Sequence, residues 1–187
     1  NDSTPRRWGL IVKFFCESAK HCGLMARAVI GIMGPGATAT PLQLELAYAL
    51  GQAIASTGWV VLTGGRAAGV MEAACQGAQA AGGLTIGILP SADGADMSAA
   101  VDIPILTGLG DGRNVVNVLS SRVVVACGLG PGTAAEIALA LKAQRPVILM
   151  AMPPGANDLW QSLATGPIAI ASTVEAAVAQ IQQWLVP

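Results

Sequence analysis

Three glycine-rich loops are the segments of this chain whose residue types can bind an anion. Each loop follows a short apolar run and precedes an Ala/Leu-rich segment, which is typical of the connection between a β-strand and a helix. Glycine exposes backbone N–H groups, and those at a helix N-terminus lack a partner within the helix, so such loops bind phosphate. The three loops are Gly34-Pro35-Gly36-Ala37-Thr38-Ala39, Gly64-Gly65-Arg66-Ala67-Ala68-Gly69 and Gly128-Leu129-Gly130-Pro131-Gly132-Thr133.

Glycine can also serve only to make a tight turn. For any one loop, this interpretation is as good as that of an anion site. Three such loops in one chain favour an anion site. The first loop has the G-x-G-x-x-A spacing of dinucleotide-binding proteins, but the next apolar run ends at Thr63 without the acid that holds a ribose hydroxyl. The sequence has no G-x-x-x-x-G-K-S/T motif, and the loops contain no lysine. We therefore expect neither NAD nor the chemistry of P-loop nucleotidases.

Two arginines accompany these loops and could bind the same anion. Arg66 lies inside the second loop, and Arg113 follows Gly108-Leu109-Gly110-Asp111-Gly112, at the end of another apolar run. A guanidinium group binds phosphate through two parallel hydrogen bonds, which suits arginine to this task. The alternative is that each arginine lies on the surface and caps a turn.

An acidic residue, Glu136, follows the third loop and has two interpretations. Thr133-Ala134-Ala135-Glu136 fits a capping box, in which the carboxylate would bind the backbone N–H of Thr133. The functional interpretation places the carboxylate at the mouth of the loop, near Arg113, where it could act as an acid or a base. Cys127, which ends the preceding apolar run, is expected to be a buried small hydrophobe.

Composition excludes several classes of protein. The chain has 187 residues, 53% of them apolar and 11% charged, with a formal net charge of -1, so a single core without an attraction for nucleic acid is expected. His21 is the only histidine and the four cysteines form no C-x-x-C pair, which removes the Ser-His-Asp, Cys-His and zinc chemistries. No apolar run approaches the roughly 18 residues of a membrane span. We expect a cytoplasmic protein that binds no metal ion, membrane or nucleic acid.

From residue 28 onward, short β-branched runs alternate with longer Ala/Leu-rich segments. Most of the short runs are apolar throughout, which favours strands covered on both faces and therefore a parallel sheet with helices on either side. We expect residues 1–27, which lack a clear period, to be an N-terminal extension, and residues 28–187 to be a single domain. The expected strands are 29–33, 59–63, 84–89, 103–106, 123–127, 147–150 and 168–170, and the expected helices are 41–57, 69–81, 113–120, 133–143 and 173–184.

Four motifs follow one another along the chain: Thr63-Gly64-Gly65-Arg66, Gly69-Val70-Met71-Glu72, Gly112-Arg113-Asn114 with Asn117, and Gly130-Pro131-Gly132-Thr133-Ala134-Ala135-Glu136. Taken in this order, they resemble the molybdenum cofactor carrier proteins of algae and cyanobacteria. That family belongs to a wider superfamily with the LONELY GUY phosphoribohydrolases, often mislabelled as lysine decarboxylases. The resemblance implies an α/β, Rossmann-like, doubly wound fold with a mainly parallel sheet of about seven strands and helices on both faces. It also implies a homo-oligomer, either a dimer or a tetramer.

The resemblance leads to two functional hypotheses. In the first, the protein is a non-catalytic carrier or storage protein that binds the phosphate of molybdenum cofactor and shields this oxidation-prone ligand. Storage and delivery both stay open, and in the case of delivery a molybdoenzyme is the acceptor. In the second, it is a phosphoribohydrolase that cleaves the N-glycosidic bond of a nucleoside 5'-monophosphate, with Arg113 and Glu136 as the catalytic pair. A nucleotide-sensing module or an oligomeric scaffold is a third possibility. The residues expected to bind the cofactor are Gly34, Pro35, Gly36, Gly64, Gly65, Arg66, Gly69, Val70, Met71, Arg113, Asn117, Gly130, Pro131, Gly132, Thr133 and Glu136.

Overall fold

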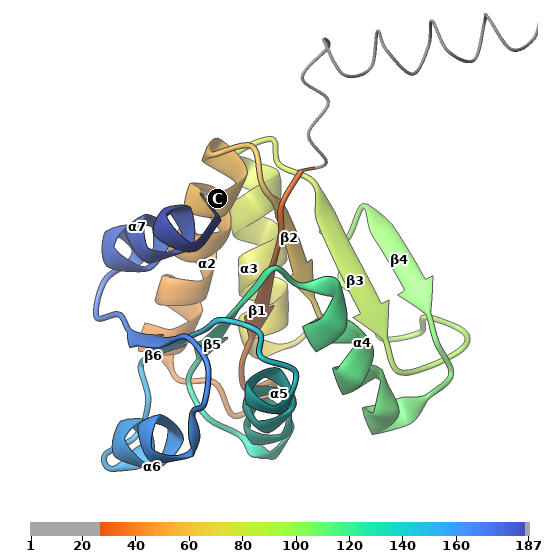
Figure 1. The fold of residues 1–187 in the computed structure, drawn as a ribbon. Coiled ribbons are helices and arrows are strands. Elements are labelled where there is room, and N and C mark those ends of the chain that lie inside the picture. Colours follow the sequence, from red (N-terminus) through yellow and green to blue (C-terminus); the bar gives the residue numbers. More distant parts are fainter. Residues whose placement is uncertain (1–26, 186–187) are drawn as a thin grey trace, which may run out of the picture.

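A seven-stranded sheet lies between two layers of helices in the computed structural model, which describes residues 27–185 (Figure 1). All neighbouring strands are parallel, and their spatial order is β4-β3-β2-β1-β5-β6-β7. The expected extension, apart from Arg27, lies outside the described residues. The strands are β1 (Val29–Met33), β2 (Val60–Thr63), β3 (Thr85–Leu89), β4 (Ile103–Leu106), β5 (Val123–Cys127), β6 (Val147–Met150) and β7 (Ile168–Ile170).

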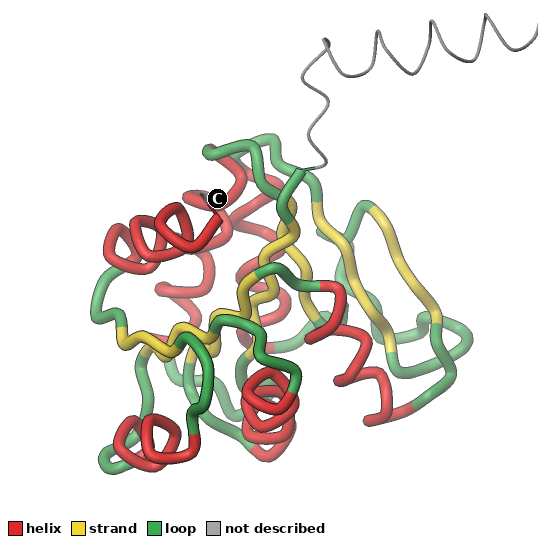
Figure 2. Tube along the Cα trace, in the orientation of Figure 1, coloured by secondary structure: helices red, strands yellow, loops and turns green. Residues whose placement is uncertain are grey.

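The two helical layers cover opposite faces of the sheet and bury two separate apolar clusters (Figure 2). Successive side chains of a strand point to opposite faces, so Ile30 and Ile32 pack in one cluster and Met33 in the other. Helices α2 (Pro41–Ser56), α3 (Gly69–Ala80) and α7 (Val174–Leu185) contribute to the first cluster. Helices α4 (Arg113–Ser120), α5 (Pro131–Lys142) and α6 (Ala156–Leu163) contribute to the second, and a short 3-10 helix η1 (Gly110–Gly112) precedes α4.

The α/β, doubly wound fold that the sequence predicts is confirmed, with small differences at element ends. Thr40 caps α2 through a capping box with Gln43. Helix α5 begins at Pro131, two residues earlier than predicted, because proline suits the first helical position. The prediction misses α6, which follows a Pro-Pro-Gly segment and buries Trp160.

Strand β4 departs from the expectation that the strands are covered on both faces. It is the edge strand beside β3, and all four of its residues are exposed. Its apolar composition resembles that of the buried strands, but Pro104 fits an edge strand, because proline has no N–H to donate to a neighbouring strand, and it was the sequence signal for this position.

Parallel strands bring the loops that follow them to one edge of the sheet. Chain order reverses at β1, which lies between β2 and β5, and this is the position at which open α/β sheets bind ligands. The first and third glycine loops follow the two strands at this switch point, and the second follows the neighbouring β2.

Candidate functional site

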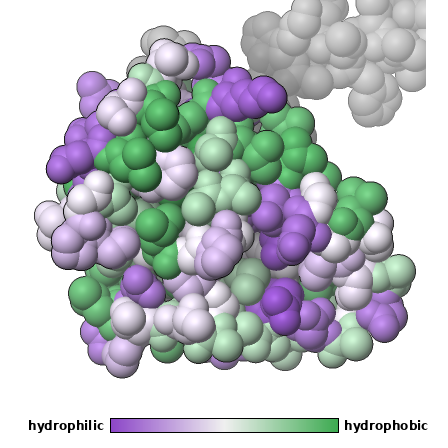
Figure 3. Space-filling view, turned by 90° about the horizontal axis from the view of Figure 1, so that it is seen from below, coloured by the Kyte–Doolittle hydropathy of each residue, from purple (hydrophilic) through white to green (hydrophobic). Residues whose placement is uncertain are grey.

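A polar cavity of about 250 Å³ lies at the carboxyl edge of the sheet, where the three glycine loops meet. Figure 3 looks at this edge from below and shows hydrophilic side chains gathered toward the middle of the face. The cavity is lined by Met33, Gly34, Pro35, Gly36, Thr38, Gly64, Arg66, Met71, Asp111, Arg113, Asn114, Gly130, Pro131, Gly132, Thr133 and Glu136.

The third loop supplies unpaired backbone donors to this cavity. Gly130 is the N-cap of α5, without a side-chain hydrogen bond to cap the helix, and the first intrahelical bond runs from the Ala134 N–H to the Gly130 carbonyl at 2.8 Å. The N–H groups of Gly132 and Thr133, which precede that bond, therefore have no helical acceptor. Together with the positive end of the helix dipole, these groups are suited to hold an anion, which the sequence predicts at this loop.

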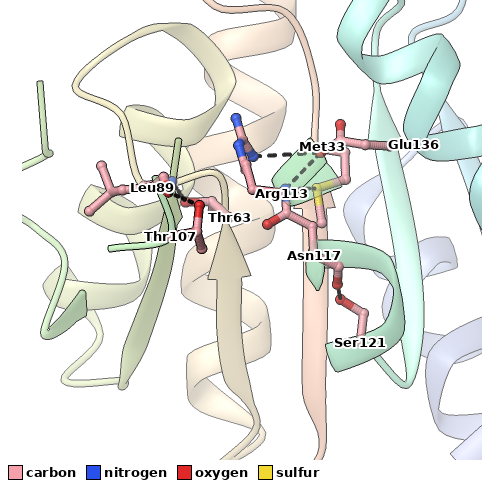
Figure 4. A network of polar contacts seen from close by, with 9 residues as sticks. Met33, Thr63, Leu89, Thr107, Arg113, Asn117, Ser121 and Glu136 are labelled. Atoms are coloured by element: carbon pink, nitrogen blue, oxygen red, sulfur yellow. Dashed lines mark hydrogen bonds and ion pairs between the residues drawn. The ribbon is translucent and has the colours of Figure 1, made fainter. Parts of the chain in front are cut away.

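The capping-box interpretation of Glu136 is wrong. Thr133 is itself inside the first turn of α5, so Glu136 falls in the second turn and does not reach back to a helix cap. Its side chain is only 7% exposed and points toward α4, where the Asn117 Nδ2 donates to its Oε1 at 2.7 Å (Figure 4). Arg113 lies on the same side, with its Nη1 3.7 Å from that oxygen.

Burial decides the electrostatics of this cluster. Desolvation raises the pKa of Glu136, although the Asn117 hydrogen bond and the Arg113 charge lower it. Desolvation also lowers the pKa of Arg113, while the attraction of Glu136 raises it and the repulsion of Arg66 lowers it. Arg113 stays charged because an arginine has the highest pKa of any side chain. An anion in the cavity would relieve the repulsion between the two guanidinium groups.

The position of Arg113 depends on a glycine at the end of β2. A Cβ atom built on Gly64 would lie 2.3 Å from the Arg113 Nη1, so the guanidinium group lies directly against the backbone there. The loop that precedes Arg113 in the chain is fixed by Thr107. The Thr107 hydroxyl donates to the Leu89 carbonyl at 2.7 Å and accepts from the Leu109 N–H at 3.2 Å. Figure 4 shows Thr107 beside Leu89, and Arg113 on the same edge of the sheet.

Arg66, the second arginine, is held differently. Its Nε lies 2.5 Å from the Asp96 Oδ2, and its side chain is 48% exposed. The backbone of the same residue pairs with Met97 in an isolated antiparallel bridge, which anchors the second loop. Within residues 27–185, no acceptor binds its two terminal nitrogens, which stay available to a ligand at the cavity.

Most of the residues predicted to bind the ligand surround this one cavity, and four do not line it. Val70 is fully buried, and its N–H donates to the Pro35 carbonyl at 3.0 Å, so it fixes the first loop. Asn117 lies behind Glu136 and orients the carboxylate. The other two are Gly65 and Gly69, which shape the second loop.

Four residues that line the cavity are not among those that the sequence predicts to bind the ligand: Met33, Thr38, Asp111 and Asn114. Asn114 and Asp111 flank Arg113 and its preceding glycine, so their place in the chain was the signal that could have found them. Thr38 lies in the first loop, three residues before the start of α2.

The described residues offer no metal centre and no thiolate. Residues 27–185 contain no cluster of three or more His, Cys, Asp or Glu side chains that could hold a metal ion. Cys127 is buried as predicted, and desolvation raises its pKa to about 12, so it stays a thiol at neutral pH. No helix within the described residues has the length and hydropathy to cross a membrane.

The fold and the site together define an α/β protein of the Rossmann-like class with a polar cavity at its switch point. The sequence pattern of the SLOG cluster4 family matches residues 27–179. The chain belongs to this family.

Solved structures extend the comparison. The chain is 54% identical to the molybdenum cofactor binding protein of the phototrophic bacterium Rippkaea orientalis, with a TM-score of 0.83, covering 85% of this chain and 98% of that one. It is 50% identical to the molybdenum cofactor carrier protein of Chlamydomonas reinhardtii, with a TM-score of 0.82, covering 86% and 99%. These matches confirm the resemblance to the carrier proteins.

A shorter similarity points to the wider superfamily. Over 64 residues the chain is 39% identical to a cytokinin riboside 5'-monophosphate phosphoribohydrolase of Mycobacterium marinum, which covers 34% of each chain. The segment is too short to carry that enzyme's activity to this chain.

Proposed function

We propose that this protein binds molybdenum cofactor without converting it, and stores or carries it. One observation carries the proposal: unpaired N–H groups and two arginines surround one polar cavity. The chain that holds this cavity is 54% identical to a molybdenum cofactor binding protein, and the match covers 98% of that protein. The ligand phosphate would take the donors of Gly132 and Thr133. Arg66 and Arg113 would add charge-assisted hydrogen bonds, which are stronger than neutral ones.

The test is retention and protection of the cofactor. Molybdenum cofactor released anaerobically from a molybdoenzyme is mixed with the protein, and the pair is separated by gel filtration. Elution of molybdenum and oxidised-pterin fluorescence with the protein supports the proposal, as does a longer half-life of the cofactor in air. Arg113→Ala provides the comparison, and equal retention by this variant would contradict the role of the cavity.

A phosphoribohydrolase is the second candidate, and the paired Arg113 and Glu136 favour it. A carboxylate beside a sugar can stabilise the positive charge that develops at the glycosidic carbon while an arginine holds the 5'-phosphate. Incubation with AMP and assay for free adenine decides between the candidates. Release of base that Glu136→Ala abolishes would favour the enzyme, whereas an absence of release supports the carrier.

We propose further that the protein forms a homo-oligomer in the cytoplasm and passes its ligand to a molybdoenzyme. The uncovered edge strand supports the first part, because Ile103, Ile105 and Leu106 of β4 are exposed, as are Val115 and Leu119 of α4. Exposed apolar surface of this kind marks protein contacts. Light scattering of the full-length chain measures the oligomer, and activation of a cofactor-free molybdoenzyme by the loaded protein measures the transfer.

A further inference from the structure

A second hollow, of about 410 Å³, borders the polar cavity at the first glycine loop. The two hollows share Pro35 and Thr38 in their linings and therefore lie next to each other. We call this second hollow the β6 groove, and it is lined by Pro35, Thr38, Thr40, Leu42, Gln43, Leu129, Ala151, Met152 and Pro153. Apart from Pro35, none of these residues was assigned to ligand binding from the sequence.

Size shows why the polar cavity needs an extension. Its volume of about 250 Å³ corresponds to roughly eight water molecules at about 30 Å³ each. A phosphorylated pterin with its metal has several times that number of non-hydrogen atoms. Small-molecule sites usually occupy about 300–1,000 Å³, a range that the cavity reaches only together with the β6 groove.

The walls and the polar edge of the groove differ in chemistry. Leu42, Leu129, Met152 and Pro153 provide apolar surface, and a thioether makes favourable contacts with flat rings. The polar edge comes from Gln43 and the Ala151 carbonyl.

The Gln43 amide is fixed in place. Its Oε1 accepts from the Thr40 N–H at 3.0 Å, which assigns the oxygen, and a Cβ on Gly128 would lie 2.3 Å from its Nε2. Its Nε2 reaches the Ala151 carbonyl only at 3.5 Å, beyond the usual range for N–H donors.

Ala151 is held in the left-handed region, with φ +48°, immediately after β6. Such a conformation is unfavourable for alanine, and strained residues of this kind concentrate at ligand sites. Among the described residues, its carbonyl accepts no hydrogen bond other than the long one from Gln43. The polar edge therefore offers a free carbonyl acceptor beside an amide that both donates and accepts.

From these observations we infer that the β6 groove holds the amino-oxo heteroaromatic ring of the ligand whose phosphate lies in the polar cavity. An exocyclic amino group donates to the Ala151 carbonyl, the amide of Gln43 pairs with the ring N–H and carbonyl, and the ring lies on the apolar wall. Pterin and guanine share this donor and acceptor pattern, so the ring belongs either to the cofactor itself or to a nucleotide attached to it. The inference rests on the proposed function for the identity of the ligand.

Calorimetric titration of the full-length protein with three phosphates isolates the ring. Ribose 5-phosphate has the anion alone, GMP adds the amino-oxo ring, and AMP adds a ring without that pattern. We expect GMP to bind about tenfold more tightly than ribose 5-phosphate, because an added hydrogen bond and an apolar contact contribute a factor of that order. AMP should gain clearly less than GMP.

Two variants and a control place the ring in the groove. Met152→Trp fills the groove and should reduce GMP affinity to that of ribose 5-phosphate, whose own affinity stays the same. Gln43→Glu keeps an acceptor for Thr40 and removes the amide donor, so it should abolish the preference for GMP over AMP without filling space. Leu163→Trp is the matched control, on an exposed residue of α6 outside the groove, and should change nothing.

Titration with molybdenum cofactor itself separates the two sources of the ring. Cofactor affinity that falls in Met152→Trp assigns the groove to the pterin, whereas loss of GMP affinity alone assigns it to the attached nucleotide. Equal binding of GMP and ribose 5-phosphate by the wild type, or undiminished GMP binding by both groove variants, would overturn the inference. Wild-type protein that binds GMP tightly and does not retain the cofactor would instead contradict the proposed function and leave the groove assignment standing.

Discussion

Gly64→Ala tests whether the polar cavity depends on the exact seat of one guanidinium group. A methyl group at this position would lie 2.3 Å from the Arg113 Nη1 and 2.5 Å from its Nη2, so the two cannot coexist. The backbone of Gly64 is outside the left-handed region, which means that alanine brings no backbone strain. The contact is with the end of a flexible side chain, and we expect Arg113 to swing away while the fold persists.

The effect on binding should be large and the effect on stability small. A hydrogen bond to a charged group contributes about 1.5–3 kcal/mol, so its loss should weaken phosphate binding roughly ten- to hundredfold. Glu136 would lose its cation but keep the Asn117 hydrogen bond, and its raised pKa lets it become neutral. A cost of about 1 kcal/mol lowers Tm by roughly 2–4 °C in a protein of this size.

The assay pairs calorimetric titration of inorganic phosphate with thermal unfolding. Gly112→Ala is the control, because a methyl group there meets its nearest neighbour, the Leu109 Cβ, at an ordinary 3.7 Å. We expect wild-type affinity in this control. Wild-type phosphate affinity in a folded Gly64→Ala variant would refute the argument that binding needs Arg113 in its observed position.

Three further predictions concern the remaining charges and the open edge of the sheet. Burial raises the folded-state pKa of Glu136 above its unfolded value, so the folded protein binds the extra proton and loses stability as pH rises through that interval. The advantage of Glu136→Gln over wild type in urea-unfolding free energy should therefore grow as pH rises above the ordinary pKa of a glutamate, and a difference that stays constant with pH would contradict this. Asp96→Asn should weaken phosphate binding less than about fivefold, since exposed ion pairs contribute about 0–1 kcal/mol. Arg66→Ala should weaken phosphate binding more than Asp96→Asn does. The reverse order in calorimetric titrations would give Asp96 a separate role. Ile105→Lys should yield a folded monomer by light scattering, because this residue is exposed on β4, and its Tm should be lower than that of the oligomer, since subunit contacts stabilise the folded state; an unchanged mass would place the contact elsewhere.

The sequence by itself determined the fold class and the edge of the sheet at which the polar cavity lies. Both follow from local chemistry: apolar runs of strand length favour burial in a sheet between helices, and a glycine loop between a strand and a helix leaves N–H groups unpaired. Because the strands are parallel, these loops converge without any further information. Six of the predicted elements have the observed bounds, among them β1, β4 and β5.

Tertiary structure alone decided how the charged residues are used. Glu136 binds Asn117 rather than its own helix cap because α4 and α5 pack side by side, a contact between segments separated along the chain that no local spacing encodes. The same holds for Arg113 against Gly64 and for the β6 groove between the first loop and the end of β6. Local hydrogen bonds and hydrophobic periodicity are short-ranged, whereas these features arise where distant segments meet and compete for the same space and the same partners.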